Sequence, residues 1–448
     1  MTRRTNRREF LAQTASGVIA SGFFINSSPA KDSDSPNERL NLAAVGATGR
    51  AGANISGCSS QNIVAVADVD ANLLDKGCQK YPNARKYRDF RVMLEKEADK
   101  IDAVLVGTAD HCHAPAASMA LRLKKHTYCE KPLTHTVFEA RTLANLAQEN
   151  KLVTQMGTQI HSGDNYRRVV ELVESGAIGE VREVHVWVGV NYAGRTIVKD
   201  RPKPAHVDWD LWLGPAPEKP YLECKAGDDI LPIHPFNWRW FWDYGTGGLG
   251  DFGCHYMDLT HWALDLRNPT NVSATGPKPH PESTTAGLIV KYDYPARGKR
   301  PPVKLTWYDG GKQPGLLEEI RKKGPKDQNG KPMNLGSGQL FIGQRGMVVS
   351  NYGQHSVLPK GDAAIKRAEP YIPKSIGHHA EFLNAIKNGG ETTCNFSYSG
   401  ALTESVLLGV VAYRSGKSIE WDTKNLKITN SLEAQQLIHK EYRKGWTL

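Results

Sequence analysis

A glycine-rich turn early in the chain has the residues and spacing of a dinucleotide-binding site. The apolar run at residues 40–45 stops at the turn Gly46 to Gly52, with the sequence GATGRAG. Glycines here let the backbone approach a pyrophosphate, and the N-terminus of the following helix faces the anion. Thr48 stands where the usual fingerprint has its second glycine, so the turn is a weak signal by itself.

An acidic residue follows at the distance that such a site requires. The apolar run at residues 63–67 ends in Asp68, 22 residues after Gly46. A carboxylate there accepts hydrogen bonds from both adenosine ribose hydroxyls and repels a 2′-phosphate. This favours NAD over NADP, although Arg50 could partly offset the repulsion. The alternative is that Asp68 caps the next helix, because Asp is a favoured N-cap residue.

The elements that must position these residues alternate between strand and helix. Apolar runs at residues 40–45, 63–67, 101–106 and 127–129 predict strands, and residues 115–123 predict one of the intervening helices. This alternation predicts a parallel sheet whose carboxyl ends line the ligand crevice. Thr108, His111 and Lys131 lie at such ends, so we predict a nucleotide-binding domain over residues 39–160.

Three segments resemble motifs of the Gfo/Idh/MocA oxidoreductases, named after glucose–fructose oxidoreductase and inositol dehydrogenase. Residues 108–113 (TADHCH) are similar to the T-P-D-H-x-H segment of that family, and residues 130–132 match its E-K-P signature. Residues 245–255 (GTGGLGDFGCH) resemble its G-G-x-x-x-D-x-x-x-H segment. Thr48, Ala109 and Cys112 depart from the family pattern, the first in the cofactor turn and the others in the pocket.

The resemblance implies a Rossmann domain followed by an open-faced, mainly antiparallel sheet domain, which we place at residues 161–448. It also implies a catalytic group formed by Lys131, Asp251 and His255, with a cis bond between Lys131 and Pro132. We expect NAD, with NADP as the alternative, as the cofactor. Its expected contacts are Gly46, Thr48, Gly49, Arg50, Asp68, Thr108, His111, Glu130 and Lys131.

Those three residue types suit the oxidation of a secondary alcohol. His255 has an intrinsic pKa near neutrality and can take the hydroxyl proton. Asp251, four residues earlier, shares its helical face and can orient the ring. Lys131 can stabilise the developing alkoxide while the cofactor takes the hydride. The structural alternatives are a packed histidine, a helix-capping aspartate and a surface lysine.

A metal site is an alternative role for the histidines of the 108–113 segment. His111 and His113 could meet His255 or the pair at residues 378–379. However, no ligand-spacing motif is present in the sequence. We therefore predict no metal.

The second half has the alternating patterns of half-exposed strands. Residues 184–190 and 302–308 predict strands, and residues 340–343 and 347–350 predict a hairpin. Residues 431–443 predict a docking helix. The aromatic run at residues 238–244 suits stacking on a sugar ring, or packing in the core. The predicted substrate contacts are Trp238, Trp240, Trp242 and His113.

The N-terminus has the layout of an export signal. Residues 1–30 join a basic stretch, a short apolar stretch and small residues, and Arg7-Arg8 with Phe10-Leu11 resembles the twin-arginine signal. Residues 31–38 predict a linker. A frayed tail on a cytoplasmic enzyme is the alternative. We expect a periplasmic or otherwise exported protein without a later membrane span.

Composition narrows the class of partner. Basic and acidic residues alternate despite a net charge of +10, so nucleic acid is not expected as a partner.

The seven cysteines form no CxxC pair, and we expect them to be free. We expect a homo-oligomer formed through the second sheet.

Three functions remain open at this stage. The leading one is a NAD(P)-dependent oxidoreductase that acts on a sugar or polyol with a tightly held cofactor. A redox-neutral enzyme that cleaves or epimerises through a transient keto sugar is the first alternative. A non-catalytic sugar or nucleotide sensor is the second.

Overall fold

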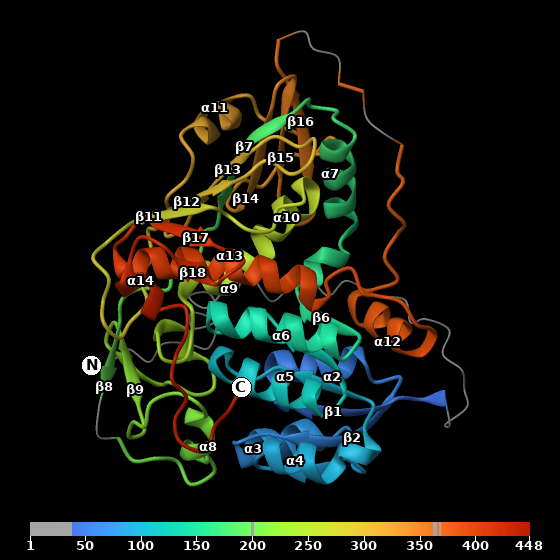
Figure 1. Ribbon diagram of the computed structural model, residues 1–448, viewed down its shortest axis with the longest axis vertical. Coiled ribbons are helices and arrows are strands. Elements are labelled where there is room, and N and C mark those ends of the chain that lie inside the picture. The colour runs from blue at the N-terminus through green and yellow to red at the C-terminus, as the bar shows by residue number, and fades with distance from the viewer. Residues whose placement is uncertain (1–37, 199–200, 362–364, 367–368) are drawn as a thin grey trace, which may run out of the picture.

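The N-terminal domain is a six-stranded parallel sheet of order β3-β2-β1-β4-β5-β6, covered by helices (Figure 1). The computed structural model describes residues 38–198, 201–361, 365–366 and 369–448. The strands are β1 Asn41–Val45, β2 Asn62–Ala67, β3 Arg85–Tyr87, β4 Ala103–Val106, β5 His126–Glu130 and β6 Thr154–Gly157. The helices are α2 Gly49–Gly57, α3 Ala71–Cys78, α4 Phe90–Glu97, α5 His113–Arg122 and α6 Val137–Glu149.

This strand order confirms the predicted nucleotide-binding fold. Strand β4 is buried throughout, as its unbroken apolar sequence requires in a sheet covered on both faces. From β1 the strands are added first on one side, as β2 and β3, and then on the other side, as β4, β5 and β6. The ligand crevice of a doubly wound sheet lies at such a switch point, here between β1 and β4. The residues that follow β2, β4 and β5 therefore converge on one edge of the sheet.

The second domain is built on a nine-stranded mixed sheet of order β16-β15-β14-β7-β13-β12-β11-β17-β18. Only β7 and β13 pair in parallel among its described strand pairs. Buried Val290, Tyr292 and Tyr294 alternate with exposed side chains along β12, so one face of the sheet meets the core. The strands are β7 Val181–Trp187, β11 Asn271–Thr275, β12 Ile289–Tyr294, β13 Val303–Tyr308, β14 Gly338–Gly343, β15 Gly346–Ser350, β16 His355–Pro359, β17 Ile419–Asp422 and β18 Lys427–Ile428.

Smaller elements fill the space beside this sheet. The strands β8 Arg195–Val198, β9 Glu223–Ala226 and β10 Asp229–Pro232 form a separate three-stranded sheet. The remaining helices are α7 Asp164–Glu174, α8 Trp209–Leu213, α9 Gly247–Tyr256, α10 Asp258–Leu264, α11 Leu316–Lys322, α12 His378–Asn388, α13 Phe396–Ser415 and α14 Leu432–Gln436.

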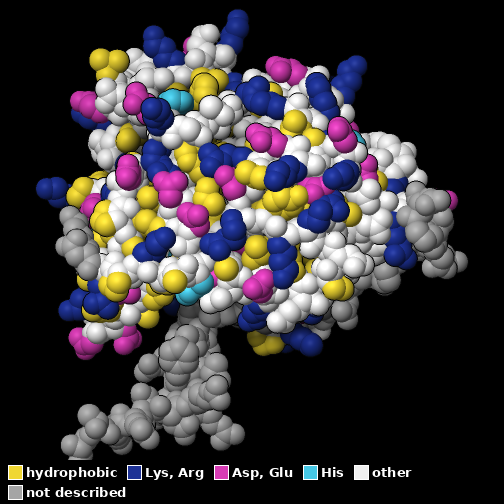
Figure 2. Space-filling view, turned by 90° about the horizontal axis from the view of Figure 1, so that it is seen from below, with side chains coloured by type: hydrophobic (Ala, Val, Ile, Leu, Met, Phe, Trp, Pro, Cys, Tyr) yellow, Lys and Arg dark blue, Asp and Glu magenta, His cyan; other side chains and the backbone are white. Residues whose placement is uncertain are grey.

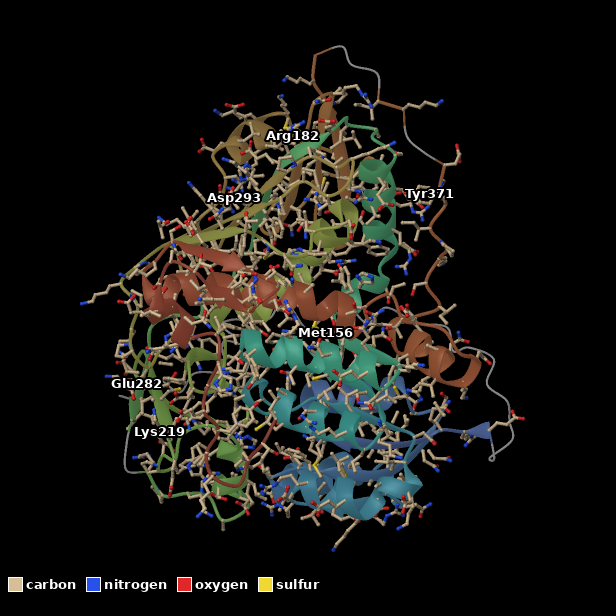
Figure 3. The ribbon with its side chains drawn as sticks, viewed as in Figure 1. Met156, Arg182, Lys219, Glu282, Asp293 and Tyr371 are labelled. Atoms are coloured by element: carbon tan, nitrogen blue, oxygen red, sulfur yellow. The ribbon has the colours of Figure 1, made fainter. Side chains whose placement is uncertain are left out.

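Helix α13 joins the two domains. It contacts α6 of the first domain, α9 of the second and strand β11, and it lies across the centre of Figure 1. Its long central stretch is almost entirely buried, as expected for a helix apolar on all sides. Met156 of β6 lies in this central region in Figure 3, and its sulfur accepts a hydrogen bond from Thr403 of α13. Helix α9, which carries Asp251 and His255, is thus held against the first domain through α13.

The predicted C-terminal helix is wrong over most of its length. Only Leu432–Gln436 is helical, and the chain then continues as an irregular tail. Along this tail, Lys440 and Tyr442 pair with Glu139 of α6, and Arg443 pairs with Asp210 of α8. Because these long-range contacts outweigh local helix propensity, the tail runs along both domains instead of continuing the helix.

Other predictions are confirmed or lie outside the described residues. The hairpin of residues 340–350 is β14 and β15, and all seven cysteines are free and buried. The signal at residues 1–30 and nearly all of the linker lie outside the described residues. Each helix within the described ranges is too short or too polar to cross a membrane. Acidic and basic side chains are interspersed on the face seen in Figure 2.

Candidate active site

The glycine turn is shaped to accept an anion. Gly46 and Gly49 have φ values of +97° and +57°, and a Cβ on Gly46 would lie 2.8 Å from the Ala51 Cβ. Thr48 begins α2 without a side-chain cap, and the first turn of α2 has no acidic residue. The first amide groups of the helix are thus free to bind a pyrophosphate, which fits a dinucleotide cofactor.

Asp68 links the end of β2 to this turn. Its carboxylate accepts hydrogen bonds from the backbone N–H groups of Ala47 and Asp70, each 3.0 Å long. Burial raises the pKa of Asp68 to about 6, so the group is ionised at neutral pH. The cap of α3 is Asp70, which accepts from Asn72 and Leu73, so the alternative reading of Asp68 as that cap is wrong.

Lys131 and Asp251 form the centre of the predicted catalytic group. Lys131 follows β5, and its Nζ donates to the Asp251 carboxylate and, at 3.0 Å, to the Asp251 main-chain carbonyl. Tyr192 donates a 2.7 Å hydrogen bond to the other carboxylate oxygen. Burial opposes ionisation of Asp251, but Lys131 and Arg239 together hold its pKa well below the ordinary value. Asp251 is therefore a carboxylate at any working pH.

His255 lies one helical turn beyond Asp251 on α9. The expected orienting contact is not made, because the Asp251 carboxylate is occupied by Lys131 and Tyr192. The Nδ1 atom of His255 is buried without a hydrogen-bond partner. Burial, and then the charge of Lys131, lower the pKa of His255 well below its ordinary value. The ring is therefore neutral, its Nδ1 atom is unsatisfied, and the charges of both Lys131 and Asp251 act on it.

Glu130 is turned into the protein rather than toward open crevice. Its Oε1 atom accepts from Asn54 at 3.0 Å and from Gln159 at 2.8 Å. Asn54 in turn accepts a 3.0 Å hydrogen bond from His379 of α12. A Cβ on Gly157 would lie 2.5 Å from the Glu130 carboxyl carbon, so this glycine makes room for the carboxylate. Glu130 fixes the start of the 130–132 segment and hence the direction of Lys131.

The two predicted histidines of the 108–113 segment do not join the cluster. They lie beyond the end of β4, His111 in a 3₁₀ turn, Asp110–Cys112, and His113 at the start of α5. His111 Nε2 donates to the Trp212 carbonyl at 2.9 Å. His113 lies between the carbonyls of Pro132 and Thr108, at 2.7 and 3.1 Å. Both side chains are buried and support the loops that carry the site.

The predicted tryptophans divide between site and core. Trp240 packs 4.4 Å from Tyr192, measured between ring centroids, and thereby supports the hydroxyl that binds Asp251. Trp238 lies under the guanidinium of Arg239, at 4.2 Å. Trp242 packs in the main core and donates to the His280 carbonyl, at 3.0 Å. None of the three is freely exposed.

Three polar residues of the site were not predicted from the sequence. Tyr192 reaches Asp251 from a loop, and Arg239 reaches it at 3.8 Å from the short 3₁₀ helix Asn237–Trp240, in both cases without a spacing signal in the sequence. Asp110 lies inside the 108–113 segment, and its acidic side chain at the end of a predicted strand could have marked it as a site residue. Its carboxylate is buried and accepts a 3.2 Å hydrogen bond from Thr246. Burial, and then the charge of Asp251, raise the pKa of Asp110 to about 8.

The rest of the described structure was compared with this cluster for metal sites and cavities. Within the described ranges, no group of three or more His, Cys, Asp or Glu side chains is arranged to hold a metal. A hollow of about 850 Å³ opens between α6, α10 and residues 390–398. It is lined by no residue of the predicted site.

Comparison with known proteins places both halves of the chain in one group. Residues 40–158 match the family model described as "Oxidoreductase family, NAD-binding Rossmann fold". Residues 163–299 match the one described as "Oxidoreductase family, C-terminal alpha/beta domain". Both models carry the name GFO_IDH_MocA, which agrees with the motifs at residues 108–113, 130–132 and 245–255.

Curated relatives match over part of their length. Inositol 2-dehydrogenase of Salmonella typhimurium is 28% identical over 141 residues, which are 31% of this chain and 40% of the relative. Levoglucosan dehydrogenase of Pseudarthrobacter phenanthrenivorans is 22% identical over 206 residues, 44% of this chain and 42% of the relative. The chain thus aligns with about two fifths of the length of these relatives.

Solved structures share the fold over most of the chain. Levoglucosan dehydrogenase in complex with NADH and levoglucosan superimposes with a TM-score of 0.55 at 16% identity, covering 85% of this chain and 99% of the other. The WlbA dehydrogenase of Bordetella pertussis, in complex with NADH and UDP-GlcNAcA, gives 0.57 at 14% identity, covering 86% and 99%.

Proposed function

Because the chain belongs to the Gfo/Idh/MocA oxidoreductase family, we propose that it transfers a hydride between a sugar or polyol hydroxyl carbon and NAD. The observation that carries this proposal is the grouping of Lys131, Asp251 and an unpartnered His255 nitrogen at the edge of a nucleotide-binding sheet. Such an arrangement supplies an electrophilic donor and a proton acceptor side by side. NADP is the less favoured cofactor, because Asp68 is negatively charged where a 2′-phosphate would lie.

Lys131 stabilises the substrate oxygen. An ammonium group has three N–H donors, and two of those on Lys131 are directed to Asp251. The third is available for a hydroxyl that becomes an alkoxide as its carbon is oxidised. Asp251 holds the lysine ammonium in place through two hydrogen bonds, and Tyr192 holds the carboxylate in place.

His255 moves the proton. A ring held neutral can accept the hydroxyl proton during oxidation, and the imidazolium formed beside Lys131 returns it readily during reduction. The bound cofactor supplies the hydride acceptor or donor. The proton on oxygen and the hydride on carbon thus leave the alcohol by separate routes, which leaves a ketone.

A sugar or polyol is the proposed substrate class. Two relatives are named as inositol and levoglucosan dehydrogenases, and both names describe polyhydroxylated rings. The polar groups around Asp251 suit such a ring, because they can exchange hydrogen bonds with its hydroxyls. An enzyme that cleaves or epimerises a sugar without net oxidation would begin with the same hydride transfer to NAD. A non-catalytic sugar or nucleotide sensor would carry out no hydride transfer.

The test is a NAD titration followed by a panel of sugars and polyols. We expect saturable NAD binding and formation of a keto product with at least one member of the panel. Net epimerisation or cleavage without accumulated keto sugar would favour the redox-neutral alternative. Binding of NAD and sugars without any product would favour the sensor, and absence of NAD binding would overturn the proposal.

We also propose export of the folded enzyme by the twin-arginine pathway. Arg7 and Arg8 precede a short apolar segment, and a large α/β protein that needs a cofactor benefits from folding before export. Changing both residues to lysine is expected to leave an active enzyme in the cytoplasm. Export of that variant would remove the assignment.

Self-association through the second sheet is proposed as well. The face of β12 and β13 opposite the core carries Lys291, Asp293 and Lys304, and Asp293 is labelled in Figure 3 on the upper domain. A polar sheet face with both charge signs can pair with a second copy around a twofold axis. Sedimentation of the purified chain tests this, and a monomer at all concentrations would contradict it.

A further inference from the structure

The second domain is bonded directly to the loop that follows Asp68. Residues 204–208 (PAHVD), here called the 204–208 segment, run antiparallel to the end of β2 and pair at Asp70 and Val207. Ala71 N–H donates to the His206 carbonyl, and Asp208 N–H donates to the Val69 carbonyl, each at 2.9 Å. Figure 1 shows α8, which follows the segment, beside α3.

Side chains reinforce this junction from both sides. Arg88 donates to the carbonyls of Val69 and His206, the latter at 3.0 Å, so one guanidinium joins the two strands of the junction. The Asp70 carboxylate lies 3.1 Å from His234 Nε2 and 3.6 Å from His206 Nε2. The segment is therefore fixed by backbone and side-chain contacts together.

The junction lies over the adenosine end of the crevice. Val69 and Asp70 directly follow Asp68, the residue placed to bind the ribose, and Ala109 follows β4 on the other side of the switch point. Val69 and Ala109 pack in one apolar cluster with Val207, Trp209 and other second-domain residues. Loops from both edges of the adenosine site are thus covered by the second domain.

We propose that the 204–208 segment is a clamp that encloses the adenosine half of bound NAD and makes the cofactor a resident group that does not exchange during turnover. This inference rests on the proposed function, and it concerns retention rather than chemistry. Release of the nucleotide then requires the segment to separate from residues 69–71. Because the segment is fixed by contacts on both sides, little ordering is needed to hold it closed over the ligand.

One substitution removes a single bond of the clamp without disturbing the helix beside it. Ala71 is the first residue of α3, a position that favours proline, and Asp70 before it has the extended backbone that proline requires. Ala71→Pro therefore deletes the N–H bonded to His206 and places a ring against that carbonyl. Leu432→Pro is the matched control, because Leu432 is the exposed first residue of α14 and Ser431 before it is also extended.

The experiment measures the release of isotopically labelled NAD from the loaded full-length chain into excess unlabelled NAD. Wild type and Leu432→Pro are expected to release it equally slowly. Ala71→Pro is expected to release it about tenfold faster, the scale of one lost hydrogen bond. Arg88→Met, which keeps the apolar stem of the side chain but removes the guanidinium and its two hydrogen bonds to the junction, is expected to act in the same direction if the proline variant folds poorly.

The outcomes separate the clamp from the proposed function. Binding of NAD with the same release rate in wild type, Ala71→Pro and Arg88→Met would overturn the clamp and leave the proposed function standing. Fast release of NAD from the wild type would also overturn the clamp and leave the proposed function standing. Failure of the wild type to bind NAD would overturn both. Faster release from the two clamp variants, with melting temperatures near that of the wild type, supports the clamp.

Discussion

Lys131 and Asp251 are joined twice, since the lysine Nζ bonds to both the carboxylate and the main-chain carbonyl of the aspartate. Lys131 belongs to the first domain and Asp251 to helix α9 of the second. The catalytic pair therefore forms only where the two domains meet. A side chain held at two points keeps its charge at one place, which is what stabilisation of a developing alkoxide requires.

Removing either reacting side chain should lower turnover without removing cofactor binding. Lys131→Ala and His255→Ala are each expected to reduce kcat by about 10²-fold or more, the usual scale for such groups. The NAD affinity should change little, because the glycine turn and Asp68 are untouched. Steady-state kinetics and a NAD titration measure the two quantities. Unchanged kcat in either variant would assign that residue a packing role.

Asp110 should make the protein less stable as the pH rises. Its pKa is about 8 in the folded chain against an ordinary value of 3.8, so the folded state binds the extra proton between these values. The free energy of unfolding contributed by this group is then fully present below pH 3.8 and is lost as the pH rises through about 8. Asp110→Asn keeps a neutral side chain and removes this dependence.

Melting temperatures measured from about pH 5 to about pH 9 test this prediction. The melting temperature of Asp110→Asn relative to wild type is expected to rise across that range. Asp293→Asn, at an exposed position on β12, serves as the control and should parallel the wild type. Parallel curves for Asp110→Asn and wild type would show that Asp110 titrates normally.

The predictable part of the molecule is the part whose signals are local in sequence. The strand ends, the glycine turn, Asp68 and the segments at residues 130–132 and 245–255 each carry their own pattern, and all converge on one crevice. Parallel strands bring such ends together whatever the intervening sequence. The grouping of Asp251 and His255 with Lys131 came instead from the resemblance of their segments to the Gfo/Idh/MocA motifs, and the direct contact between Lys131 and Asp251 was not predicted.

What could not be predicted depends on contacts between distant segments. Tyr192 reaches Asp251 from an irregular loop and Arg239 from a short 3₁₀ helix. His379 reaches Asn54 from a helix 325 residues away. The tail at residues 437–446 is not helical, and Lys440 and Tyr442 within it pair with Glu139 of the first domain. Such outcomes are set by tertiary contacts rather than by local periodicity.

Asp68 should control the choice between the two nicotinamide cofactors. Asp68→Asn removes the charge that opposes a 2′-phosphate and weakens the acceptor offered to the ribose. We expect NAD affinity to fall about tenfold, the scale of a hydrogen bond to a charged group, and the ratio of NADP to NAD affinity to rise. Titration of wild type and variant with both cofactors measures this. An unchanged ratio would limit Asp68 to bracing the glycine turn through Ala47.

The most direct measurement follows reduced nicotinamide by its near-ultraviolet absorbance after a substrate sugar is mixed with the NAD-loaded protein. We expect a rapid rise toward one equivalent of NADH per active site, with keto sugar formed in the same amount. His255→Ala and Lys131→Ala, loaded with NAD to the same extent, should show the rise slowed by about 10²-fold. Keto product formed without any NADH, or equal rates in all three proteins, would contradict hydride transfer at the Lys131–Asp251–His255 site.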